Sequence, residues 1–174
     1  MQEEIINKVS QSALITLDLE TFFPPENIQI FDLKPFLFME LILKEKDFRA
    51  ALTTTDWSEY KDKIVGVFCS ADAVIPVWAY MLVTSYLQPV ATEVIMGDEA
   101  AVLRQILTNR IQEIDPKEYK DKRIVVKGCG DKPIGDFAYL EITKLLRPVA
   151  KSIMYGEPCS TVPVFKVQGS KPQA

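Results

Sequence analysis

The pattern of apolar and polar residues along the chain predicts that strands alternate with helices. Residues 14–23 alternate and fit a strand, and residues 28–31 predict a second strand that forms a hairpin with it. Residues 36–52 predict a helix that starts apolar and becomes mixed. In residues 99–114, apolar side chains at helical spacing predict one buried face made of Val102, Leu103, Ile106, Leu107, Ile111 and Ile114.

The two ends of the chain add smaller elements to this pattern. Residues 3–12 predict a short amphipathic helix. Residues 159–167 predict a last strand, and Pro163 within it predicts a sheet edge or a bulge, because proline has no amide N–H to donate to a neighbouring strand. Residues 168–174 are small and polar and are typical of a disordered tail.

One long stretch of the chain occurs twice. Residues 59–98 return as residues 118–157 at a constant offset of 59, and sixteen of the forty aligned pairs are identical. Asp56 and Asp115 each begin a matching capping box just before the two copies. Helix, strand, loop and helix form the repeating unit, with copies at about 40–98 and 99–157.

This repeat leads to a prediction of the fold class. We predict a single α/β domain over residues 1–167, in which an internal tandem duplication surrounds a small mixed sheet. Pro89 and Pro148 occupy the same place in the two copies and predict a kink or restart in each long helix, because each removes an amide donor.

The long helices of the two copies differ in their charge. Residues 73–91 carry no charged side chain, whereas the second copy has Glu141, Lys144, Arg147 and Lys151. Prolines and polar residues dilute the first stretch, so it is not expected to span a membrane. We therefore expect the first helix to be enclosed on most sides, either by the protein's own core or by a homodimer contact.

Composition excludes several classes of function. The net charge is -4 and no basic block could neutralise a row of phosphates, which argues against nucleic-acid binding. The N-terminal residues do not resemble a signal peptide, so we expect a cytoplasmic protein that does not bind a membrane. The chain has no histidine, which excludes catalytic triads and sites that depend on histidine ligands. No catalytic residue is predicted.

The three cysteines are candidates for a site at the carboxyl ends of the strands. Cys69 and Cys129 follow the two repeated strands, and Cys159 lies in a later loop. Three thiols and a carboxylate could hold zinc or an iron–sulfur cluster, because soft thiolates suit both. The spacing fits no familiar ligand motif, so two alternatives stay open: three inert core thiols, or a single reactive thiol.

Charged residues in the same loops are candidates for ligand binding. Asp72 and Asp131 recur in both copies, and Lys132 lies beside Cys129 and near the start of a helix. A lysine and a helix N-terminus together attract anions. Each aspartate could instead accept hydrogen bonds from its own loop, and the lysine could simply be solvated.

Four segments together resemble a known bacterial family, domain of unknown function 2480. The segments are FDLKPFLFMELILKEKDFRAAL, FCSADAVIPVWAYMLVTSYLQPVA, KGCGDKPI and SIMYGEPCSTVPVFK. The resemblance covers nearly the whole chain and implies a small cytoplasmic protein with a link to iron–sulfur assembly proteins. It implies no catalytic residue and no reaction.

Three functional hypotheses therefore stand side by side. The first is an accessory protein with a metal or iron–sulfur site at Cys69, Cys129 and Cys159. The second is a non-catalytic interaction module that homodimerises through the apolar first repeat helix. The third is a site for a small anion or metabolite at the two loop-to-helix junctions, with Asp72, Asp131 and Lys132.

Overall fold

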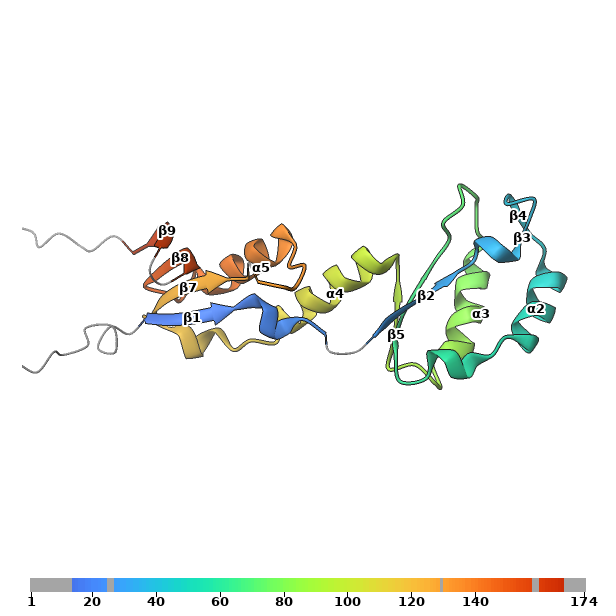
Figure 1. Ribbon diagram of the computed structural model, residues 1–174, viewed down its shortest axis with the longest axis horizontal. Helices are drawn as coiled ribbons and strands as arrows, with labels where there is room; N and C mark the ends of the chain where they lie inside the picture. Colours follow the sequence, from blue (N-terminus) through green and yellow to red (C-terminus); the bar gives the residue numbers. More distant parts are fainter. Residues whose placement is uncertain (1–13, 25–26, 129, 158–159, 168–174) are drawn as a thin grey trace, which may run out of the picture. The chain divides into compact units, whose positions relative to one another are not determined.

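The computed structural model describes residues 14–24, 27–128, 130–157 and 160–167 (Figure 1). The chain forms two compact units. Unit 1 combines the N-terminal residues up to Phe23 with the residues from Leu107 onward, and unit 2 comprises Pro24–Ile106. The predicted helix at 3–12 and the predicted tail at 168–174 lie outside the described residues. The expectation of one domain over residues 1–167 stays a prediction.

Unit 2 is built on a three-stranded parallel sheet. Its strands lie in the order β2 (Ile28–Asp32), β5 (Ile64–Phe68) and β6 (Glu93–Met96). The central strand β5 reads IVGVF and is buried along almost its whole length, as expected for a parallel strand covered on both faces. The helices α2 (Glu45–Thr54) and α3 (Val77–Leu87) contribute to a core made of Phe31, Leu33, Leu43, Phe48, Leu52, Val65, Val67, Ala79, Val83 and Leu87.

Aromatic rings reinforce this core. Phe31 stacks between Phe36 and Trp57, with ring centroids 5.4 and 5.5 Å away, and Trp57 stacks in turn on Tyr86 at 4.9 Å. The Trp57 indole also donates a hydrogen bond to the Leu52 carbonyl oxygen at 3.0 Å. Large rings in offset contact add stability beyond their buried area, so this stack joins the sheet to the segments around it.

Unit 1 repeats the plan of unit 2 and adds one strand. Its sheet has the order β1 (Leu14–Asp18), β7 (Arg123–Lys127), β8 (Ser152–Glu157) and β9 (Ser160–Lys166). The first three strands are parallel and β9 is antiparallel to β8. Helix α5 (Asp136–Leu146) packs on the sheet, in a core made of Leu17, Leu19, Ile111, Ile124, Val126, Ala138, Ile142, Leu146, Ala150 and Ile153.

Shorter elements complete the described chain. A two-stranded antiparallel pair joins β3 (Leu37–Phe38) to β4 (Ile42–Leu43). The four short 3-10 helices are η1 (Leu19–Phe22), η2 (Lys34–Phe36), η3 (Trp57–Tyr60) and η4 (Pro116–Tyr119). The predicted capping aspartates are confirmed as N-caps, because Asp56 and Asp115 accept hydrogen bonds from the N–H groups of Ser58 and Lys117.

The boundaries of several elements follow the sequence offset of 59. Helices α3 and α5 begin and end at positions 59 apart, and η3 and η4 do the same. The most similar segments, EYKDK and PVA, meet through backbone hydrogen bonds in each unit. Asp62 N–H donates to the Val90 carbonyl at 3.0 Å, and Asp121 N–H donates to the Val149 carbonyl at 2.9 Å. Both aspartates have φ of 58°, so these identical motifs serve the same backbone junction.

Helix α4 (Glu99–Gln112) confirms the helical pattern predicted for residues 99–114. Val102 and Ile106 pack with Ile64 and Ile95 in unit 2. Ile111 belongs to the core of unit 1. Leu103 and Ile114 are half-buried, so the predicted apolar face is reproduced. The boundary between the units falls inside this helix.

Two predictions about local structure were wrong. Residues 14–23 and 28–31 form no hairpin, because β1 pairs with β7 and β2 pairs with β5. Most of the helix predicted at 36–52 is replaced by the β3–β4 turn, in which Met39 and Glu40 have positive φ, and the helix starts only at Glu45. A short apolar run fits a strand as well as a helix, and here the turn at Met39 and Glu40 gives two short strands instead of a helix.

The prolines of the two copies also act differently from the prediction. Helix α3 ends at Leu87 and α5 at Leu146, two residues before Pro89 and Pro148. Neither helix kinks or restarts at its proline, since proline follows the end of the helix and cannot continue it. By contrast, the last strand is confirmed as β9, with a bulge beside Pro163 at the edge of the sheet.

Gly66 allows a close backbone approach at the centre of unit 2. A Cβ atom there would lie 2.7 Å from the Gly97 carbonyl oxygen, 2.7 Å from Ile30 Cδ1 and 2.8 Å from Val102 Cγ2. We expect Gly66→Ala to lower the free energy of unfolding by about 1–3 kcal/mol, because the backbone must shift to admit the methyl group. Urea denaturation followed by circular dichroism measures the change.

Gly135→Ala is the matched control for this substitution. The three atoms nearest to a Cβ atom at Gly135 all belong to the ring of Phe137, a side chain that can move. We expect a smaller loss than for Gly66→Ala, and equal losses would contradict the backbone explanation.

Candidate functional site

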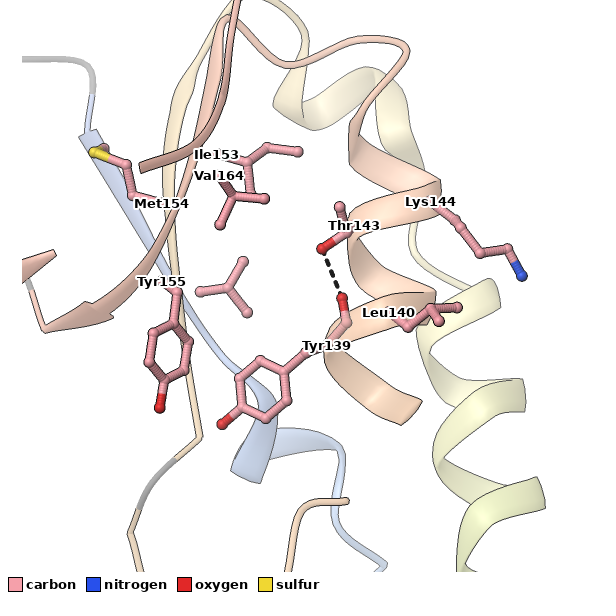
Figure 2. A pocket seen from close by; sticks show the side chains of 9 residues that line it. Tyr139, Leu140, Thr143, Lys144, Ile153, Met154, Tyr155 and Val164 are labelled. Carbon is pink, nitrogen blue, oxygen red and sulfur yellow. Dashed lines mark hydrogen bonds between the residues drawn. The ribbon is translucent and has the colours of Figure 1, made fainter. Parts of the chain in front are cut away.

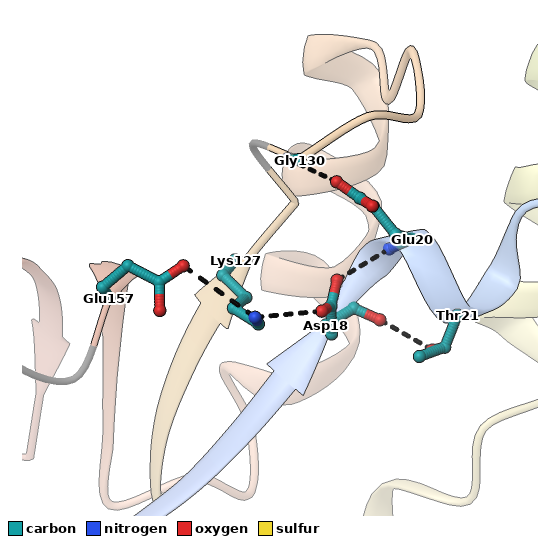
Figure 3. Close-up of polar contacts among 6 residues, drawn as sticks. All are labelled: Asp18, Glu20, Thr21, Lys127, Gly130 and Glu157. Atoms are coloured by element: carbon teal, nitrogen blue, oxygen red, sulfur yellow. Dashed lines mark hydrogen bonds and ion pairs between the residues drawn. The ribbon is translucent and has the colours of Figure 1, made fainter.

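The carboxyl ends of the parallel strands of unit 1 bring three charged side chains together. Asp18 ends β1, Lys127 ends β7 and Glu157 ends β8. Lys127 Nζ lies 3.1 Å from Asp18 Oδ2 and 3.9 Å from Glu157 Oε1 (Figure 3). The hydrogen bond to Asp18, together with the negative charges of Asp18 and Glu157, raises the pKa of Lys127 above its ordinary value.

The Glu20 carboxylate fixes the loop after β7. Glu20, in η1, accepts a hydrogen bond from the backbone N–H of Gly130 (Figure 3). Asp18 Oδ1 holds Glu20 in place by accepting its N–H at 3.0 Å, and Thr21 Oγ1 donates to the Asp18 carbonyl oxygen at 2.7 Å. A Cβ atom on Gly130 would collide with the Glu20 carboxylate, so any other residue there would require the Glu20 side chain to shift.

Unit 2 has an aspartate at the same place in its sheet. Asp32 ends β2 and accepts hydrogen bonds from Ser70 Oγ at 2.5 Å, Ser70 N at 3.0 Å and Lys34 N at 2.9 Å. Partial burial opposes ionisation of Asp32, but these hydrogen bonds and the Lys34 charge outweigh it and lower the pKa of Asp32. In unit 2, Asp32 at the end of β2 therefore anchors the loop after β5. In unit 1, Glu20 in the turn after β1 anchors the loop after β7 in the same way.

These anchors were missed in the sequence. Asp18 and Asp32 each close a strand and are each followed by a buried leucine, Leu19 or Leu33. The aspartate–leucine pair that both strands share was the available signal. The two pairs are not related by the offset of 59, so the alignment of the two copies did not reveal them. The anchors are engaged in holding loops, and Lys127 is flanked by two carboxylates, so the strand ends of unit 1 disfavour a bound anion.

The described residues of the predicted site are divided between the two units, with Cys69 and Asp72 in unit 2 and Asp131 and Lys132 in unit 1. Cys69 follows β5 and is partly buried against the core of unit 2. Asp72, Asp131 and Lys132 are exposed. Lys132 Nζ lies 4.9 Å from the centre of the Phe23 ring, a cation–π contact within unit 1.

Cys129 and Cys159 lie outside the described residues. Among the residues that the structure describes, no group of three or more histidine, cysteine, aspartate or glutamate side chains could hold a metal ion. The metal or iron–sulfur site therefore stays a prediction, as do the ligand roles of Asp72, Asp131 and Lys132.

Two apolar grooves lie at corresponding places in the two units. The first, in unit 1, has a volume of about 430 Å³ and lies between α5 and the strands β8 and β9 (Figure 2). Tyr139 and Tyr155 stand edge to face across it, with ring centroids 5.5 Å apart. Its lining residues are Val126, Tyr139, Leu140, Thr143, Lys144, Ile153, Met154, Tyr155 and Val164.

The second groove lies in unit 2 and has a volume of about 540 Å³. We call it the β6 groove; its lining residues are Val67, Val77, Tyr80, Met81, Thr84, Val94 and Met96. Six of these seven positions correspond, at the offset of 59, to residues that line the groove of unit 1. The same groove therefore occurs in both units, but only the groove in unit 1 has a β9 residue, Val164, in its wall.

Exposure distinguishes the β6 groove further. Val77, Met81 and Met96 are 75%, 68% and 69% exposed, and nearby Val74 is 92% exposed. Of the two alternatives expected for enclosing the first repeat helix, the core of its own unit is therefore wrong for this side of α3, and the homodimer contact stays a prediction. Helix α3 buries Ala79, Val83 and Leu87 and leaves an uncharged apolar side facing outward.

Comparison with known proteins identifies the family. The family described as "Protein of unknown function (DUF2480)" matches residues 3–167. The chain belongs to this family. The resemblance noted in the sequence is thereby confirmed, while a search of curated proteins and one of solved structures each found no match. Within the described ranges, no helix is long and apolar enough to cross a membrane.

The Asp32 anchor makes a prediction about stability and pH. We expect Asp32→Ala to lower the free energy of unfolding by about 1–3 kcal/mol at pH 7, because the donors from Ser70 and Lys34 lose a charged acceptor. A lowered folded-state pKa means that the contribution is present above the unfolded pKa of about 4 and is lost as pH falls through the folded pKa. Urea denaturation at pH 7 and at several values below 4 measures both effects.

Asp72→Ala provides the control, since Asp72 is exposed in the loop after β5 that Asp32 anchors through Ser70. We expect a change within about 0.5 kcal/mol at every pH. A loss for Asp32→Ala that stays constant down to acidic pH would argue against an ionised anchor.

Proposed function

We propose that the protein is a non-catalytic interaction module that forms a homodimer through α3 and the β6 groove. The observation that carries the proposal is the set of large apolar side chains exposed along this groove: Val77, Met81 and Met96. Contiguous apolar surface of this kind marks interaction sites, because leaving it in water is unfavourable.

The contrast with unit 1 supports this choice of surface. At the position of Val77, helix α5 has Asp136, and the exposed side of α5 also carries Lys144, which pairs with Glu141 at 2.9 Å. Charged side chains keep that surface hydrated. Helix α3 has no charged residue along its length, so its outward side favours a protein partner over water.

The positions of the charged groups also favour binding over catalysis. Asp32 accepts three hydrogen bonds, Glu20 holds the loop at Gly130, and Lys127 lies between two carboxylates. Each of these groups stabilises a loop or a sheet edge in its own unit. The proposal therefore assigns the strand-end charges to structure and the apolar groove of unit 2 to function.

An internal duplication belongs to the same proposal. The matching bounds of α3 and α5, the paired EYKDK and PVA junctions and the two corresponding grooves support descent of both units from one ancestral unit. In this account, unit 1 gained charged residues and the strand β9, while unit 2 kept an open apolar groove for a partner.

Val77→Asp tests the homodimer. It places at position 77 the residue that unit 1 has at the corresponding position, and an acidic residue in the first turn of α3 is compatible with the helix. We expect the wild-type protein to be a dimer and the variant to associate at least tenfold more weakly, a loss of about 1.4 kcal/mol or more, because a charge would enter an apolar contact. Analytical ultracentrifugation over a concentration series measures both.

Leu140→Asp is the matched control in unit 1. Leu140 corresponds to Met81 and is 57% exposed, so the substitution adds the same charge to the other groove. We expect this variant to dimerise as the wild type does. A wild-type protein that stays monomeric at every concentration would overturn the proposal.

A further inference from the structure

The outer edge of β6 differs from the corresponding edge in unit 1. In unit 1, β9 pairs antiparallel with β8, with Ile153 opposite Phe165 and Tyr155 opposite Val162. In unit 2, β6 is the last strand of its sheet, and no described strand lies beyond it. The edge position that unit 1 fills with β9 is therefore open among the described residues of unit 2.

We propose that β6 of a second copy pairs antiparallel with this edge, so that two three-stranded sheets join into one sheet of six strands. The inference rests on the proposed homodimer and specifies how its backbones meet. Strand addition of this kind uses main-chain hydrogen bonds for affinity and side chains for specificity. An apolar strand edge left open is otherwise prone to uncontrolled pairing.

The backbone of β6 is arranged for such pairing. Ile64 N–H donates to the Asn27 carbonyl on the β2 side, so Val65 and Val67 direct their backbone groups toward β6, and Gly97 N–H donates to the Val67 carbonyl at 3.0 Å. Because successive residues of a strand point their N–H groups to opposite sides, the N–H groups of Val94 and Met96 point away from β5. Two donors and their carbonyl acceptors are thus presented at the open edge.

The side of α3 above this edge is complementary to itself. Val77, Met81 and Thr84 follow the spacing i, i+4 and i+7, so they form one stripe, and all three line the β6 groove together with Val94 and Met96. A two-fold axis perpendicular to the joined sheet keeps both α3 helices on the same face. The two apolar stripes then lie opposite each other above the paired β6 strands.

The register follows from which face each side chain occupies. Val94 and Met96 line the groove, whereas Ile95 packs on the other face with Ile64, Val102 and Ile106. Residues opposite each other in antiparallel strands share a face, so the two-fold axis passes through Val94 or Ile95.

In both registers, the two Glu93 carboxylates avoid each other. Glu93 lies opposite the partner subunit's Ile95 when the axis passes through Val94, and opposite the partner subunit's Gly97 when it passes through Ile95. An antiparallel pairing of β6 with itself therefore places no acidic residue directly opposite its own copy. The charge pattern is compatible with a second copy as the occupant.

Size and symmetry also favour this occupant. Stable interfaces bury about 800 Å² per partner, and two strands of this length cannot supply that area alone. The stripe on α3 and the exposed Met96 add apolar surface on both copies at once. Because a two-fold contact uses the same patch on each copy, it closes after two chains and leaves no free β6 edge.

Cysteine cross-linking tests the strand pairing directly. In a full-length background with Cys69, Cys129 and Cys159 replaced by serine, we expect either Val94→Cys or Ile95→Cys, whichever residue lies at the two-fold axis, to form an interchain disulfide under mild oxidation, because residues at this axis lie within disulfide reach. The matched controls are Ile153→Cys and Met154→Cys, the corresponding positions in unit 1, where β9 covers the strand edge. We expect no interchain disulfide from these controls.

Amide hydrogen exchange gives a second readout that needs no cysteine. We expect the amides of Val94 and Met96 to exchange at least tenfold faster in the Val77→Asp variant than in the wild type. The amides of Ile153 and Tyr155, at the corresponding positions beside β9, should exchange equally in both proteins.

The possible outcomes separate this inference from the proposed homodimer. A dimer in which Met81→Cys cross-links and neither Val94→Cys nor Ile95→Cys does would overturn the strand pairing and leave the homodimer standing. A monomeric wild type would overturn both. Protected Val94 and Met96 amides in a monomer would mean that another part of the same chain covers the edge, which also overturns the inference.

Discussion

The larger sheet of each unit depends on parallel pairing between strands that are far apart in the chain. Leu14 in β1 lies opposite Arg123 in β7, and Ile28 in β2 lies opposite Ile64 in β5. Parallel strands cannot be joined by a tight turn, so each pairing must be secured by its own contacts. Asp18 and Asp32 provide such contacts, because each joins the end of the incoming strand to the central strand or to the loop that follows it.

This pairing also shapes the surface of the molecule. In each unit, a helix that crosses between two parallel strands covers part of the sheet and leaves a groove beside the last strand. Unit 1 extends its sheet with β9, while the described part of unit 2 stops at β6. The two units therefore have the same plan but present different edges, and the functional proposals depend on this difference.

Periodic and local features of the sequence were predicted well. The helical spacing of Val102, Ile106 and Ile111 marks the buried face of α4, and the capping aspartates Asp56 and Asp115 occupy the expected places. These features depend on neighbours within one or two turns of a helix, so the sequence carries them directly. The resemblance to the family was also confirmed, because motifs as long as those it rests on are specific.

Features that depend on distant partners were predicted poorly. The hairpin of residues 14–23 and 28–31 failed because short apolar strands carry no information about which strand they join. The sequence could not decide whether the protein's own core or a second copy encloses α3, because a missing charge signals burial but does not identify what covers the helix. The anchors Asp18, Glu20 and Asp32 were missed because their partners, Lys127, Gly130 and Ser70, are far away in the sequence.

The division of the chain between the units has a consequence for the order of folding. Unit 2 comprises one continuous segment, whereas unit 1 needs β1 from the beginning of the chain and β7 from its last third. During synthesis, β2, β5 and β6 can therefore complete their sheet while β1, the first described strand to be made, still lacks its partner. The first described strand to leave the ribosome is thus among the last to be paired, and it must stay available without aggregating until β7 emerges.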